Sequence, residues 1–177
     1  MSLRPPLLLA CLLTSLAMAG CATHTGAAPA LVRYKIPGSN FPIANAVEVP
    51  AGAGTVYLSG KTATLKDKSK SPTEIAAYGD TETQTVSVLQ AIDAQLKGMG
   101  LSMSDVVKMQ AFLVKDPAKG GKMDFAGFMK GYSQFFGTAT QPNLPSRSTL
   151  EVAALANPAL LVEIEVMAVR GGQSVNR

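Results

Sequence analysis

Strict alternation of apolar and polar residues runs through several segments of this chain, and it predicts β-strands with one buried face. The longest example is 160–169, where Val162, Ile164, Val166 and Ala168 would face one way and Glu163, Glu165 and Met167 the other. The other predicted strands are 44–49, 55–59, 106–115 and 148–152. Because the sequence at 50–54, Pro-Ala-Gly-Ala-Gly, is typical of a turn, we expect the first two of these strands to form a hairpin.

Two other segments have apolar residues three and four positions apart, which is the spacing of an amphipathic helix. The first begins at Asp80, ends near Gly98 and Gly100, and presents Val88, Leu89, Ile92, Leu96 and Met99 on one face. The second ends at Gly137 and carries the aromatic-rich set Phe125, Phe128, Met129, Tyr132, Phe135 and Phe136. We interpret this aromatic stripe as a core face that packs on a sheet, with a ligand pocket as the alternative.

The order of these elements, β-β-α-β-α-β-β, predicts an α+β fold with both helices on one face of a mixed sheet. The other face would have no helix over it, so we expect other subunits to cover it. About 140 residues are available for this fold, enough for one domain with one core. We assign the domain to 33–172 and a C-terminal tail to 173–177.

The first twenty residues have the layout of a secretory signal: a positive charge at Arg4, a short apolar run and small residues before Cys21. The sequence Ala-Met-Ala-Gly before Cys21 resembles a bacterial lipobox. We therefore predict a lipoprotein signal peptide at 1–20, an acylated Cys21 as membrane anchor on the periplasmic side, and a flexible tether at 21–32. An ordinary cleaved signal with an incidental cysteine is the alternative.

Composition excludes several kinds of chemistry for the folded part. The chain has two cysteines and one histidine, and Cys11, Cys21 and His24 all precede the predicted domain. The predicted domain therefore lacks the thiol and imidazole groups that cysteine- or histidine-dependent nucleophilic catalysis needs, and it lacks the usual ligands of a zinc site. The net charge of +4 falls to +3 once Arg4 is removed with the signal, too little for the basic surface of a nucleic-acid-binding protein.

The candidate chemistry is one arginine and one glutamate near the C-terminal end. Arg147 follows Pro145 and opens a predicted strand, where its planar guanidinium could hold a carboxylate through two parallel hydrogen bonds. Glu163 lies on the polar face of the next predicted strand. If the two strands pair antiparallel, both side chains could converge on one pocket, in which the glutamate positions water for hydrolysis. A surface Arg-Glu ion pair is the alternative.

The motifs Pro145-Ser146-Arg147-Ser148 and Val162-Glu163-Ile164-Glu165, together with Val56-Tyr57-Leu58-Ser59-Gly60, resemble those of the RidA (YjgF/YER057c/UK114) family. The resemblance covers nearly the whole domain. It implies a chorismate-mutase-like fold, a homotrimer with pockets at subunit interfaces, and hydrolysis of reactive enamines and imines to 2-keto acids and ammonia without metal or cofactor. It also implies that Arg147 binds the substrate carboxylate and that Glu163 orients the water.

The same resemblance implies further pocket residues: Ser59, Gly60 and Thr149. Two positions depart from the family pattern, because Ile43 stands where a tyrosine is usual and Met129 where an asparagine is usual. We therefore expect a more apolar pocket around the bound imine or keto acid. The alternative function is a trimer that binds small carboxylates, or acts like a chaperone, without turnover. A ribonuclease role is disfavoured by the low charge and the missing histidine, and we expect no nucleic-acid partner.

Overall fold

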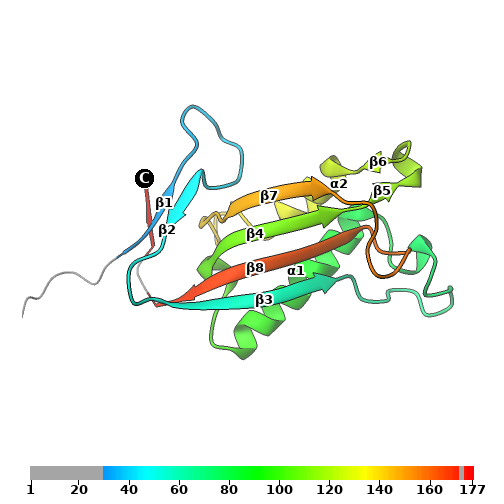
Figure 1. Ribbon diagram of the computed structural model, residues 1–177, viewed down its shortest axis with the longest axis horizontal. Coiled ribbons are helices and arrows are strands. Elements are labelled where there is room, and N and C mark those ends of the chain that lie inside the picture. Colours follow the sequence, from blue (N-terminus) through cyan, green and yellow to red (C-terminus); the bar gives the residue numbers. More distant parts are fainter. Residues whose placement is uncertain (1–29, 172–173) are drawn as a thin grey trace, which may run out of the picture.

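A four-stranded sheet forms the centre of the protein, which we describe for residues 30–171 and 174–177 from a computed structural model (Figure 1). Its strands are β3 (Gly54–Thr62), β8 (Val162–Arg170), β4 (Val106–Leu113) and β7 (Ser146–Glu151), in that spatial order. β8 pairs antiparallel with both of its neighbours, whereas β7 runs parallel to β4 and forms one edge of the sheet.

Two helices, α1 (Thr81–Gly98) and α2 (Phe125–Tyr132), cover one face of this sheet (Figure 1). Each starts at an aspartate whose carboxylate accepts a backbone N–H of the first turn: Asp80 from Thr83 and Asp124 from Gly127, both at 2.9 Å. α2 is shorter than the sequence pattern predicts, because the chain leaves the helix after Tyr132 and turns towards Gly137. The expected α+β arrangement with both helices on one side is confirmed.

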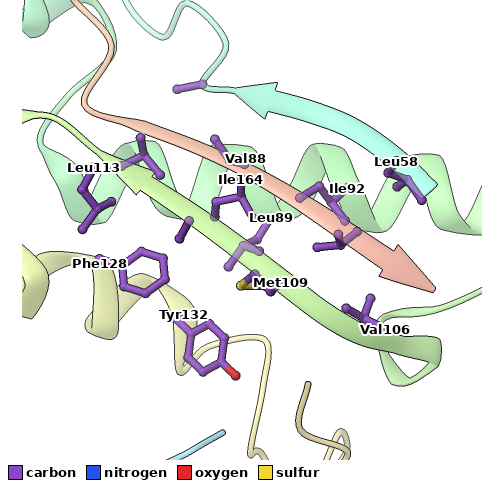
Figure 2. Close-up of a cluster of buried hydrophobic side chains, with 14 of the residues drawn as sticks. Leu58, Val88, Leu89, Ile92, Val106, Met109, Leu113, Phe128, Tyr132 and Ile164 are labelled. Carbon is purple, nitrogen blue, oxygen red and sulfur yellow. The ribbon is translucent and has the colours of Figure 1, made fainter. Parts of the chain in front are cut away.

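The core lies between the helices and the inward face of β8 and β4 (Figure 2). The alternation predicted for the last long strand is confirmed, since Val162 and Ile164 are fully buried while Glu163 and Glu165 lie half-buried on the opposite face. The helix residues Val88, Leu89 and Ile92 are likewise 0% exposed. Full burial of each such side chain contributes about 1.5–3 kcal/mol, so this interface is the main source of stability.

A second, three-stranded sheet joins the two ends of the domain: β2 (Ala46–Glu48), β1 (Leu31–Tyr34) and β9 (Ser174–Asn176), in that order. The predicted hairpin is therefore wrong, because β2 pairs with β1 while β3 pairs with β8. The domain limits also move outward. Leu31 and Val32 are buried in β1 rather than part of a tether, and the expected tail supplies a strand.

The remaining elements are short: β5 (Lys115–Asp116) pairs with β6 (Lys122–Met123), and single 3-10 turns occupy Ile75–Ala77, Met103–Asp105 and Pro117–Lys119. The predicted signal segment and Cys21 lie outside the described residues, so the lipid anchor stays a prediction. Among the helices described, none is both long and apolar enough to cross a membrane.

Candidate carboxylate-binding site

Arg147 is the second residue of β7, and its strand register decides which way it points. It lies opposite Met109 of the neighbouring β4, and Met109 is fully buried on the helix-covered face. Directly paired residues of neighbouring strands share a face of the sheet. The Arg147 side chain therefore extends towards α2, beneath the edge of the sheet, instead of into solvent.

Three aromatic rings surround the Arg147 guanidinium. Its central carbon lies 4.3 Å from the ring centre of Tyr132, 5.0 Å from that of Phe128 and 5.5 Å from that of Phe41. These separations are within the range of cation–π attraction, which contributes about 0.5–2 kcal/mol per favourable pair. The guanidinium is therefore bordered by aromatic rings on its way out from β7.

The polar partners of this guanidinium are few. Within residues 30–171 and 174–177, its Nη2 donates to the thioether sulfur of Met129 at 3.2 Å, and its Nη1 is buried without a hydrogen-bond partner. Thioether sulfur is a weak acceptor, and an unpaired buried donor costs about 1–3 kcal/mol. Thr149, two residues further along the same strand face, also has a buried Oγ1 without a partner. The site thus has unused hydrogen-bonding capacity beside a positive charge.

The protonation states at this site follow from burial. Burial lowers the pKa of Arg147, and the neighbouring Tyr132 partly offsets the effect. An arginine nevertheless stays charged at neutral pH. Burial also raises the pKa of Tyr132 well above its ordinary value, so its hydroxyl remains a donor and bonds to the carbonyl oxygen of Pro42 at 2.8 Å. The arrangement can accept one small anion, because it contains one uncompensated cation.

Glu163 lies on the other face of the sheet. It pairs with Phe112 of β4 and with Thr62 of β3, next to the irregular register between Leu58 and Lys61. Ser59 and Gly60 occupy this bulge, and a Cβ on Gly60 would collide with the Glu163 carboxylate. The missing side chain at Gly60 therefore lets the carboxylate lie directly against β3.

The expected convergence of Arg147 and Glu163 within one chain is wrong. Their strands are not neighbours, because β4 lies between β7 and β8, and the two side chains point to opposite faces of the sheet. The structure instead forms two half-sites. One contains Arg147, Thr149 and Met129; the other contains Ser59, Gly60 and Glu163.

In the segment before β2, Phe41 lies near the guanidinium and Ile43 does not line the same site. Ile43 was expected in the pocket, but it lines a separate cavity of about 180 Å³ together with Arg33 and Leu144. Phe41, two residues earlier, is the member of this segment that contacts the guanidinium. A parallel bridge between Ala44 and Ser146 holds the segment beside β7.

The sequence of this chain matches a known protein family. Residues 39–170 match the family described as Endoribonuclease L-PSP. The chain belongs to this YjgF/RidA family. A RutC family protein of Haemophilus influenzae is 33% identical over 136 residues, which are 77% of this chain and 92% of that protein.

TdcF of Escherichia coli is similar to this chain in both sequence and structure. TdcF carries the name "Putative reactive intermediate deaminase TdcF" and is 29% identical to this chain over 136 residues, which are 77% of this chain and 92% of TdcF. A crystal structure of TdcF with bound serine matches with a TM-score of 0.52 at 30% identity, covering 76% of this chain and 93% of TdcF. That relative therefore binds a small molecule with a carboxylate.

Sequence reasoning missed several residues that shape this YjgF/RidA site. Phe128 and Tyr132 were assigned to the core, which is where they lie, but their rings also contact Arg147. Arg33 was not singled out at all, although it is only 2% exposed. Its position between Val32 and Tyr34, in a short apolar segment, could have indicated that this arginine is buried. In the described part of the chain, no cluster of three or more potential metal-ligating side chains occurs.

Proposed function

We propose that this protein hydrolyses small imines and enamines that carry a carboxylate, producing 2-keto acids and ammonia. The observation that carries the proposal is the half-buried Arg147 guanidinium, which lies beside the rings of Phe128 and Tyr132 with its Nη1 unpaired. A carboxylate would displace the weak Met129 thioether contact and form two charge-assisted hydrogen bonds with the guanidinium edge. The name of TdcF and its serine complex support a small-carboxylate substrate.

The reaction is a hydrolysis that needs one positioned water. Arg147 binds the substrate carboxylate, and the C=N carbon then lies along the strand face that also carries Thr149. Glu163 takes a proton from water as the oxygen bonds to that carbon, and the proton goes to the nitrogen. The hydroxyl proton of the resulting carbinolamine then passes to its nitrogen, the C–N bond breaks with loss of ammonia, and the C=O bond of the 2-keto acid forms.

Two copies of the chain are needed for this mechanism, because one chain presents Arg147 and Glu163 on opposite faces of its sheet. Arg147 belongs to an edge strand, and Glu163 to the face without helices. An edge that packs on the open face of a second copy is a head-to-tail contact, and such contacts form closed rings or open filaments, depending on the rotation between copies. The family resemblance favours a closed ring of three. We therefore propose a homotrimer with its sites between subunits.

The proposal is tested by generating imines in solution with an amino-acid oxidase and following their loss with a trapping amine. Wild type is expected to accelerate hydrolysis and Glu163→Gln to slow it by about 10²-fold, the usual contribution of one general base. Keto-acid binding to Glu163→Gln should persist, since Arg147 is unchanged. A wild-type rate equal to the uncatalysed rate, with no keto-acid binding, would contradict the proposal.

A second candidate is a small-carboxylate binder without turnover. It is favoured by the apolar surroundings of Arg147, which include the Met129 thioether and the Phe41 ring. The hydroxyl of Thr149, on the same strand face, is also unpaired. This candidate predicts tight keto-acid binding by wild type and no faster imine hydrolysis. The ribonuclease activity in the family's description fits less well, because RNA binding relies on exposed cations, whereas this half-buried guanidinium lies beside the buried rings of Phe128 and Tyr132.

Gly60→Ala tests the second half-site. The added methyl group would push the Glu163 carboxylate away from the β3 bulge, so we expect kcat/KM for imine hydrolysis to fall by roughly tenfold or more. The neighbour is the end of a flexible side chain, and the free energy of unfolding should change by less than about 1 kcal/mol. Gly54→Ala is the matched control on the same strand, since its Cβ would find ordinary contact at 3.7 Å. An unchanged rate in Gly60→Ala would remove Glu163 from the mechanism.

A further inference from the structure

Two phenylalanine side chains remain exposed beside the half-buried Arg147 site. Phe41, from the segment before β2, is 40% exposed, and Phe125, the first residue of α2, is 36% exposed. Their rings stack on each other with centres 6.5 Å apart and planes 16° apart. Side chains so distant in sequence form a flat apolar surface only because the segment near Ala44 is bridged to β7.

This surface continues inward to the guanidinium. The Phe125 ring lies 6.2 Å from Phe128, which lies 5.9 Å from Tyr132, and both inner residues are fully buried. Phe41 contacts the Arg147 guanidinium itself. Aromatic surface therefore runs without interruption from the cation to solvent. If Arg147 binds the carboxylate of a molecule, the rest of that molecule can lie along this aromatic surface towards solvent.

We infer that Phe41 and Phe125 determine specificity by binding the side chain of the substrate. They favour imino and keto acids with large apolar side chains, those derived from aromatic and branched aliphatic amino acids, over the alanine-derived compound. The inference rests on the proposed function, since it uses the same carboxylate anchor. Burial of apolar area tightens binding by roughly fourfold for each methylene removed from water, and stacked rings add to this for an aromatic ligand.

The two phenylalanines differ in how cleanly they can be tested. Phe41 touches Arg147, so its removal also disturbs the anchor. Phe125 contacts Phe41 and Phe128 and is not among the rings around the guanidinium. Phe125→Ala is therefore the primary variant, and Phe125→Leu keeps apolar area without the ring. Val49→Ala is the control, because Val49 is 38% exposed but follows β2 in the turn before β3.

The experiment measures calorimetric affinities of the whole protein for pyruvate, 2-oxobutanoate, 4-methyl-2-oxopentanoate and phenylpyruvate. Wild type should bind phenylpyruvate at least about tenfold more tightly than pyruvate, and Phe125→Ala should reduce that ratio by about threefold or more. Pyruvate affinity should stay within about twofold in Phe125→Ala, and every affinity should do so in Val49→Ala. Phe125→Leu should keep the preference for 4-methyl-2-oxopentanoate and lose part of that for phenylpyruvate.

Two results separate this inference from the proposed function. Equal wild-type affinities across the series, or a ratio unchanged in Phe125→Ala, would overturn the specificity role and leave the carboxylate site in place. Binding of none of the four acids, together with no imine hydrolysis, would overturn the proposed function itself. A loss of pyruvate binding in Phe125→Ala would overturn the inference, since the ring would then serve the anchor.

Discussion

Arg147→Met is expected to lose keto-acid binding and imine hydrolysis while the free energy of unfolding changes by no more than about 1–2 kcal/mol. Two charge-assisted hydrogen bonds to the substrate carboxylate are removed, at about 1.5–3 kcal/mol each, so the affinity should fall by about 10²-fold or more. The free protein, in contrast, loses a buried donor that has no partner. The cation–π contacts with Phe41, Phe128 and Tyr132 are lost as well, but methionine fills a similar volume among these rings and removes a half-buried charge that has no ionic partner among the residues that the structure describes. The two effects on stability therefore oppose each other.

Calorimetry with pyruvate and urea unfolding measure the two sides of this prediction. Arg147→Lys separates charge from shape, because an ammonium is a point charge without the planar fork, and we expect it to recover only part of the affinity. Arg170→Met is the control for loss of a positive charge, since Arg170 is exposed and bonds the carbonyl of Met99. Wild-type affinity in Arg147→Met would exclude the carboxylate-anchor role.

Arg33→Met should have the opposite consequence, a large loss of stability. The Arg33 guanidinium donates to the carbonyl oxygens of Val106 (2.9 Å), Leu144 (2.6 Å) and Ser104 (2.9 Å), and to Ser174 Oγ (3.1 Å). Burial lowers its pKa to about 10, so it remains charged at neutral pH. Removing these donors leaves several acceptors unpaired in the interior, and we expect a loss of about 2–4 kcal/mol in the free energy of unfolding.

Urea unfolding at neutral pH measures this loss, with Arg33→Lys as the conservative variant that keeps the charge and part of the hydrogen bonding. Leu144 lies three residues before Arg147, so a weakened Arg33 contact should also raise the Kd for keto acids modestly. A loss below about 1 kcal/mol in Arg33→Met would mean that water replaces the guanidinium at these carbonyls.

The sequence predicted the elements of this fold better than their partners. Helical spacing located α1, and alternation in 160–169 assigned the faces of β8, because both periods follow directly from local backbone geometry. Strand pairing does not follow from local backbone geometry. The turn at 50–54 is consistent with a hairpin, yet β3 pairs with a strand more than one hundred residues later, since the central strand β8 needs hydrogen-bonding partners along both of its edges.

The site was predictable in its residue types and not in its arrangement. Arg147 and Glu163 lie in the motifs that resemble the family, but neither spacing nor periodicity indicates that β4 lies between their strands. Phe41 was missed for a related reason. Its contact with Arg147 depends on a bridge between Ala44 and Ser146, which lie about one hundred positions apart in the chain.

The placement of Arg147 and Glu163 on opposite faces of one sheet makes the proposed activity a property of an assembly. On that mechanism, a separated chain retains a carboxylate anchor and a water-orienting group that cannot act on the same molecule. Two defective chains, one lacking the arginine and the other the glutamate, would still regenerate intact sites wherever their undamaged halves meet. Selection on this protein would then act on contacts between copies as strongly as on the side chains that touch substrate.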